Sequence, residues 1–99
     1  MSDGAVGPRL EENGGGGRFV FALEDGQEAE MTWRAGPGGS MVIDHTFEPA
    51  SARGRGLAEK LVAAGVGHAR ETGRKVYPAC SYAALLFRRR AEWKDLLAG

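Results

Sequence analysis

The chain has 99 residues, and its 13 basic and 13 acidic side chains cancel to a formal net charge of zero at pH 7. Because there is no excess of positive charge, the composition does not favour nucleic acid or an anionic membrane as a partner, and any bound anion must be held locally. No apolar run approaches the roughly 20 residues of a membrane span, and the first residues lack a secretory pattern. We therefore expect a cytoplasmic protein, monomeric or weakly homodimeric.

The first 17 residues, MSDGAVGPRLEENGGGG, contain four consecutive glycines and few large apolar side chains. Such a stretch buries too little apolar surface to offset the entropy of ordering its backbone. We therefore predict a disordered tail over residues 1–17. The remaining residues, 18–99, suffice for one small domain.

Three stretches alternate apolar and polar side chains with a period of two, as strands do. They are RFVFAL from residue 18, QEAEMTWR from residue 27 and MVIDHTFE from residue 41, with glycine-containing turns between them. We therefore predict a three-stranded antiparallel meander. Its third strand should carry Met41, Ile43, His45 and Phe47 on one face, and Val42, Asp44, Thr46 and Glu48 on the other.

After Pro49, apolar residues recur at helical spacing from Leu57 to Ala69, and Gly73 is a suitable helix stop. A short strand, RKVYP, comes next, followed by a second helix, SYAALLFRRR, with Ser81 as its N-cap. The predicted order is β-β-β-α-β-α, an α+β fold. The crossover through the first helix should make the third and fourth strands parallel or nearly adjacent.

Two glycines, Gly65 and Gly67, lie inside the first predicted helix, where each costs about 1 kcal/mol relative to alanine. We interpret them as a sign of close packing between this helix and the sheet. We also expect Trp33, Phe47 and Trp93 in the core.

The stretch RGRG, residues 53–56, directly precedes the first predicted helix. A helix N-terminus carries unpaired amides and partial positive charge, and glycine lets phosphate oxygens approach the backbone. An isolated pair of glycines by itself favours a plain tight turn over an anion site, so further residues must decide. The Walker pattern fails because Leu57 and Ala58 stand where Lys and Ser or Thr are needed, and Glu59 violates the dinucleotide fingerprint.

The run Arg53-Gly54-Arg55-Gly56-Leu57-Ala58 matches the Q/R-x-x-G-x-G/A signature of the Gcn5-related N-acetyltransferases (GNAT). The stretches IDHTFEPASARGRGLAEKLV and KVYPACSYAA also resemble the small single-domain branch of that superfamily, which has a cysteine after the last core strand. This resemblance extends from Arg18 to Leu97. It implies a GNAT-like fold and an acetyl-CoA-dependent N-acetyltransferase acting on a primary amine, of a small molecule or a protein, whose identity is unknown.

The resemblance also implies which residues bind the cofactor. The loop from Arg53 to Ala58 would bind the pyrophosphate of coenzyme A through its main-chain amides. Main-chain groups between Asp44 and Phe47, including those of Thr46, would hold and polarise the thioester.

Three side chains are candidates for the chemistry of acetyl transfer. Cys80, near the start of the second predicted helix, could accept the acetyl group or protonate the leaving thiolate, or could be a small buried residue. His45 could deprotonate the amine or pair with this thiol, or could be a satisfied core residue. Tyr82 could be the proton donor that many relatives have on this helix, with Tyr77 as its rival, and either could simply pack.

Other signals are weaker. No second ligand at metal spacing accompanies Cys80, so no metal site is predicted. Arg88, Arg89 and Arg90 favour a solvated helix end over a nucleic-acid site. Two other functions stay open: a non-catalytic acyl-CoA-binding or sensing module, which needs the loop but no catalytic side chain, and a small protein-interaction domain whose glycines only form a turn.

Overall fold

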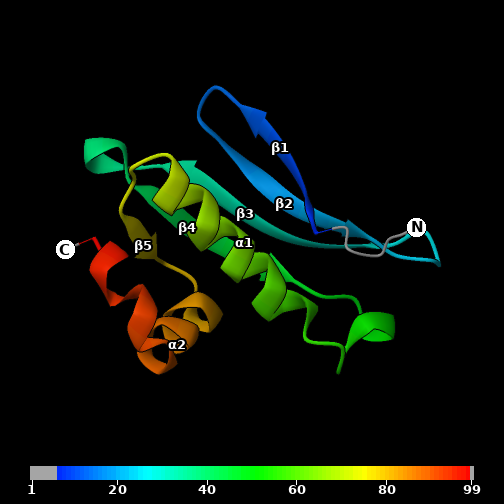
Figure 1. Cartoon of the computed structure of the whole chain (residues 1–99). Helices are drawn as coiled ribbons and strands as arrows, with labels where there is room; N and C mark the ends of the chain where they lie inside the picture. Colours follow the sequence, from blue (N-terminus) through cyan, green and yellow to red (C-terminus); the bar gives the residue numbers. More distant parts are fainter. Residues whose placement is uncertain (1–6, 99) are drawn as a thin grey trace.

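A five-stranded sheet has both α-helices packed against one of its faces in the computed structural model, which describes residues 7–98 (Figure 1). The strands lie in the order β1-β2-β3-β4-β5; β1 to β4 are antiparallel neighbours and β5 is parallel to β4. In chain order the elements are β1 (Arg9–Asn13), β2 (Gly16–Ala22), β3 (Glu28–Ala35), β4 (Met41–Phe47), α1 (Leu57–Glu71), β5 (Val76–Pro78) and α2 (Ser81–Arg89), with 3₁₀ turns at Pro37–Gly39, Ala50–Ala52 and Ala91–Leu96. The predicted α+β fold and the parallel pairing across the crossover are confirmed. No helix within the described residues is long and apolar enough to cross a membrane.

The second half of the predicted tail is part of the sheet, so that prediction is wrong for residues 9–17. Strand β1 pairs with β2 along its whole length, so the antiparallel meander has four strands and not the predicted three. The glycines that suggested disorder are needed where strand backbones approach closely. A Cβ atom on Gly16 would collide with the carbonyl oxygen of Trp33, and one on Gly17 would lie 2.5 Å from the carbonyl oxygen of Glu11. The part of the predicted tail before residue 7 lies outside the described residues.

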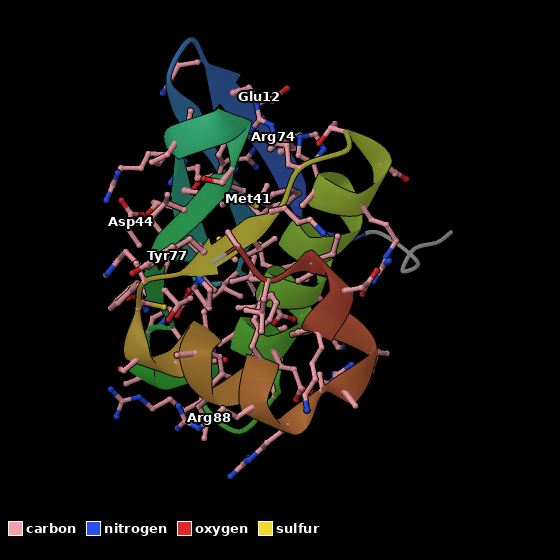
Figure 2. The ribbon with its side chains drawn as sticks, turned by 90° about the vertical axis from the view of Figure 1, so that its left-hand side faces the viewer. Glu12, Met41, Asp44, Arg74, Tyr77 and Arg88 are labelled. Atoms are coloured by element: carbon pink, nitrogen blue, oxygen red, sulfur yellow. The ribbon has the colours of Figure 1, made fainter. Side chains whose placement is uncertain are left out.

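The core fills the space between the sheet and the helices, and Met41 lies within it (Figure 2). Trp33 and Trp93 are buried as expected. Helix α1 packs closely on the sheet at Gly65, because a Cβ atom there would collide with the Met31 methyl group. The same interpretation is wrong for Gly67, which is exposed and has nothing within 4 Å of a Cβ position. The buried members of the core are Phe19, Ala29, Met31, Trp33, Met41, Ile43, Leu61, Val62, Val66, Ala69, Val76, Ala83, Leu86, Phe87, Trp93 and Leu96.

Strand β4 contains a β-bulge. Trp33 of β3 pairs with Ile43, but its neighbour Thr32 pairs with His45, so Asp44 is an extra residue on β4. An extra residue breaks the two-residue alternation and exchanges the two faces for the rest of the strand.

The bulge overturns the faces predicted for the end of β4. His45 and Phe47 point away from the core, and 54% of the His45 side chain and 48% of Phe47 are exposed. Thr46 instead lies opposite the buried Met31. The predictions of an apolar face for His45 and a core position for Phe47 are therefore wrong.

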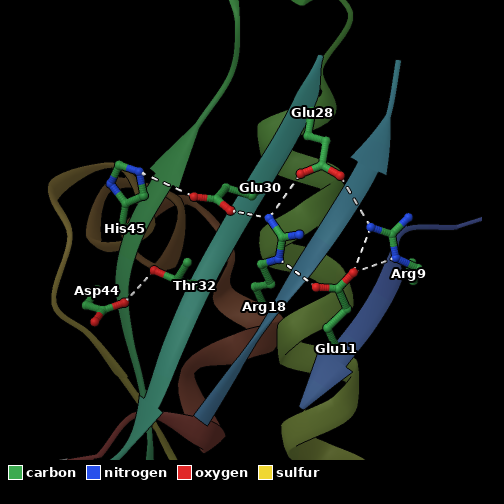
Figure 3. A network of polar contacts seen from close by, with 8 residues as sticks. All are labelled: Arg9, Glu11, Arg18, Glu28, Glu30, Thr32, Asp44 and His45. Atoms are coloured by element: carbon green, nitrogen blue, oxygen red, sulfur yellow. Dashed lines mark hydrogen bonds and ion pairs between the residues drawn. The ribbon is translucent and has the colours of Figure 1, made fainter. Parts of the chain in front are cut away.

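The face of the sheet opposite α1 carries an ionic network (Figure 3). Arg18 donates hydrogen bonds to Glu11, Glu28 and Glu30 at 2.7–3.1 Å. These carboxylates raise the pKa of the Arg18 guanidinium, so it stays charged. Arg9 also bonds two of the three carboxylates. This face is therefore polar, as expected for a sheet with helices on one side only.

The glycine run yields a test of the β1–β2 hairpin. We expect Gly16→Ala to lower the free energy of unfolding by about 1–3 kcal/mol, because the added methyl group must displace strand backbone. Gly15→Ala is the matched control, since nothing lies within 4 Å of a Cβ atom there. Urea unfolding of both variants measures the difference, and equal stabilities would contradict the close approach.

Candidate active site

Strands β4 and β5 separate after a short pairing. They pair over three residues each, and Ile43 opposite Pro78 is the last pair. Pro78 has no N–H with which to continue a ladder. The next two amides, of Ala79 and Cys80, both donate to the carbonyl oxygen of Ile43 at 2.9 and 3.0 Å and turn the chain into α2. Residues 44–47 of β4 therefore have no partner on β5.

A cleft of about 370 Å³ lies beside this unpaired end of β4. Its walls come from β4, from the loop before α1 and from the first turns of both helices. The lining residues are Thr46, Phe47, Glu48, Arg53, Ala58 and Tyr82. A larger depression, of about 520 Å³, lies over the glycines of the β1–β2 hairpin, but none of the predicted site residues lines it. The smaller cleft brings together five predicted site residues and is the candidate active site.

The loop before α1 is shaped by glycine. Gly54 and Gly56 have φ angles of +87° and +72°, a left-handed conformation that other residues rarely adopt. Nothing lies within 4 Å of a Cβ atom at either position, so their surroundings are open. Gly56 is also the N-cap of α1, and it has no side chain that could cap the helix.

Most amides at the start of α1 have no protein partner. Among the hydrogen bonds of the described residues, none is donated by the amides of Gly54, Gly56 or Leu57. The amide of Ala58 is the exception, because it donates to Glu48 Oε2 at 3.3 Å. Unpaired amides and the positive end of the helix dipole together make an anion-binding arrangement.

The arginines around this loop differ in their contacts. Arg53 is exposed at the mouth of the cleft, whereas Arg55 approaches Glu24 at 3.5 Å. Arg90 follows α2 and binds Glu59 in the first turn of α1, which fixes the two helices to each other. Of these guanidinium groups, that of Arg53 is the one positioned to meet an anion in the cleft.

Of the two tyrosines considered as proton donors, Tyr82 lines the cleft. Burial raises the pKa of its hydroxyl, the charges of Glu59 and Glu48 raise it further, and Arg89 partly opposes them. The hydroxyl is therefore protonated at neutral pH and can donate a proton. Its rival Tyr77 is 54% exposed and lies on the same side of the molecule as Asp44 (Figure 2).

Cys80 and His45 lie apart from this cleft lining. Cys80 is the N-cap of α2, and its Sγ accepts a hydrogen bond from the amide of Ala83 at 3.4 Å. The predicted N-cap, Ser81, is instead the first helical residue. His45 faces Glu30 on the outer side of the sheet, with 4.0 Å between Nε2 and Oε2 (Figure 3). No hydrogen bond or ion pair joins His45 to Cys80 in the described part of the chain, so the predicted pairing is not observed.

Glu48 was not predicted from the sequence as a site residue. The alternation of apolar and polar side chains placed it on the polar face of the strand and indicated nothing more. Its contact with Ala58 joins the end of β4 to the start of α1 across ten residues of chain. An acidic residue before a helix is a general signal for N-terminal capping. That signal was not recognisable here because a 3₁₀ turn and the glycine loop intervene.

Two comparisons with known proteins identify the family and the fold. Residues 18–96 match the model of a family described as GCN5-related N-acetyl-transferase. The fold matches the NMR solution structure of a GCN5-like protein from Staphylococcus aureus with a TM-score of 0.65 and 28% sequence identity, over 92% of this chain and 88% of that chain.

The separated strands and the glycine loop at the start of α1 thus belong to a fold of the GNAT type. The chain is a member of the GCN5-related N-acetyltransferase family. The resemblance carried by residues 53–58 is therefore confirmed at the level of the family.

The cap on α2 yields a test of the structural role of Cys80. We expect Cys80→Ala to lower the free energy of unfolding by about 0.5–1 kcal/mol, because the Ala83 amide loses its acceptor. Cys80→Ser keeps an acceptor at the cap and should be at least as stable as the parent protein. Chemical denaturation compares the free energies of unfolding of the three proteins. An Ala variant as stable as the parent protein would show that the sulfur does not cap the helix.

Proposed function

We propose that the protein is an acetyl-CoA-dependent N-acetyltransferase that acetylates a primary amine. The observation that carries this proposal is the set of unpaired amides of Gly54, Gly56 and Leu57, which lie in the chain between Arg53 and Ala58. Those two flanking residues line the cleft beside the unpaired end of β4. The family membership supports the same reaction class.

The residues around the cleft fit this cofactor. The amides of Gly54, Gly56 and Leu57 would hold the diphosphate, and the guanidinium group of Arg53 would add opposite charge. The open space over both glycines leaves room for phosphate oxygens. On the side of β4 that faces away from β3, the main-chain groups of residues 44–47, those of Thr46 and Phe47 included, would hold the pantetheine arm as an added strand would.

Acetyl-CoA, when bound, supplies the acetyl group as an activated thioester. Main-chain amides of residues 44–47 would polarise the thioester carbonyl, as preorganised donors do in acyl transfer. The Tyr82 hydroxyl would donate a proton to the departing thiolate and would regain one, through solvent, from the amine that has become an amide. His45 can take a proton only from an amine that reaches β4 from the outer face. The hydrogen bond between Cys80 Sγ and the Ala83 amide favours a structural role for that residue over that of an acetyl acceptor.

Cofactor binding is the first test of this proposal. We expect coenzyme A to raise the melting temperature, and Arg53→Ala to weaken its binding about tenfold because a charged contact to phosphate is lost. Arg88→Ala is the control, since Arg88 lies on α2 outside the cleft lining (Figure 2). Calorimetric titration measures the affinity of the parent protein and of both variants for coenzyme A. If coenzyme A did not bind even the parent protein, the glycine loop would be a plain turn, as in a protein-interaction domain.

Proton donation by Tyr82 is the second test. We expect Tyr82→Phe to lower kcat about a hundredfold, the usual range for a general acid, with little change in coenzyme A affinity. Tyr77→Phe removes a hydroxyl from the outer face and should keep the parent rate. The rate is measured as amine-dependent thiol release with a panel of primary amines. Equal rates for both variants would exclude Tyr82 as the donor, and release that no amine stimulates would favour a non-catalytic acyl-CoA module.

A further inference from the structure

The carboxylate of Glu48 occupies part of the proposed diphosphate site. Its Oε2 accepts a hydrogen bond from the Ala58 amide at 3.3 Å, and Ala58 belongs to the signature loop. Glu48 also lines the cleft, directly after the last residue of β4. A protein anion therefore sits at one of the amides where a cofactor anion would bind.

A carboxylate and a phosphate cannot share this position. Both are acceptors for the same N–H group, and two like charges at hydrogen-bond distance repel each other. The repulsion is strongest where the surroundings are partly buried, as they are around Glu48 and Ala58. The diphosphate can therefore use the Ala58 amide only after the Glu48 side chain has left it.

The Glu48 side chain can move away from the Ala58 amide. Among the described residues no ion pair involves Glu48, although Arg53 lines the same cleft. Only half-buried, its carboxylate reaches water by rotation about its own side-chain bonds. Glu59, in the first turn of α1, is by contrast bound to Arg90 and has no such freedom.

We propose that Glu48 is a built-in competitor that sets the affinity and the release rate of the cofactor. In the free protein its carboxylate holds the Ala58 amide, and it returns there when the diphosphate departs. If the carboxylate holds the amide for about nine-tenths of the time, the apparent affinity falls about tenfold. While the cofactor is bound, the displaced carboxylate stays near the diphosphate, and the repulsion between the two anions also speeds release. This inference rests on the proposed function.

The test is calorimetric titration with coenzyme A, combined with stopped-flow dissociation, of the parent protein, Glu48→Gln, Glu48→Ala and Glu59→Gln. The Gln variant keeps a hydrogen-bond acceptor but removes the charge, so it should fold, and the Ala variant removes the competitor altogether. We expect both Glu48 variants to bind about five- to tenfold more tightly, through faster association because the amide is already vacant, and through slower dissociation because the repulsion is gone. Glu59→Gln removes a nearby charge without freeing the amide, so it should change the affinity by about twofold or less.

The outcomes separate the two proposals. If the parent protein binds coenzyme A and the Glu48 variants bind equally well or more weakly, the competitor role is wrong and the proposed function stands. An equal gain in coenzyme A affinity in Glu59→Gln would also overturn the competitor role. The gain would then come from removing any negative charge near the site, and not from freeing the Ala58 amide. If none of the four proteins binds coenzyme A, both proposals fail.

Discussion

The site depends on the point at which β4 and β5 stop pairing. Pro78 cannot continue the ladder, and the carbonyl oxygen of Ile43 receives the next two amides and turns the chain into α2. The end of β4 is therefore left without a partner on that side, while Tyr82 is carried to the cleft by the first turn of α2. One short parallel pairing thus produces both an open strand edge and a wall opposite it.

The start of α1 supplies the other half of the site. Left-handed glycines leave the first amides without a side-chain cap, and Arg90 holds the helix start through Glu59. Such an uncapped helix end costs stability unless something satisfies its amides. In the free protein Glu48 satisfies one of them. The same geometry that creates an anion site therefore also invites an anion of the protein to occupy it.

Features specified by local chemistry were predictable from the sequence. Helix periodicity, the stop at Gly73 and the glycine loop before Leu57 identified α1 and its exposed start. Long-range features were not predictable. The requirement for Gly16 comes from the backbone of a strand far along the chain, so its run of glycines resembled disorder. The bulge at Asp44 depends on register with β3, and the alternation alone placed His45 on the wrong face.

The central claim is that main-chain amides at the start of α1 bind a diphosphate ester. The most direct measurement is the change in amide chemical shifts, by two-dimensional NMR, when coenzyme A is added to the labelled protein. The account predicts that the largest shifts fall on Gly54, Gly56, Leu57 and Ala58, with smaller ones along the end of β4. Saturable binding with no shift at these amides, or with the largest shifts at the glycines of the β1–β2 hairpin, would contradict it.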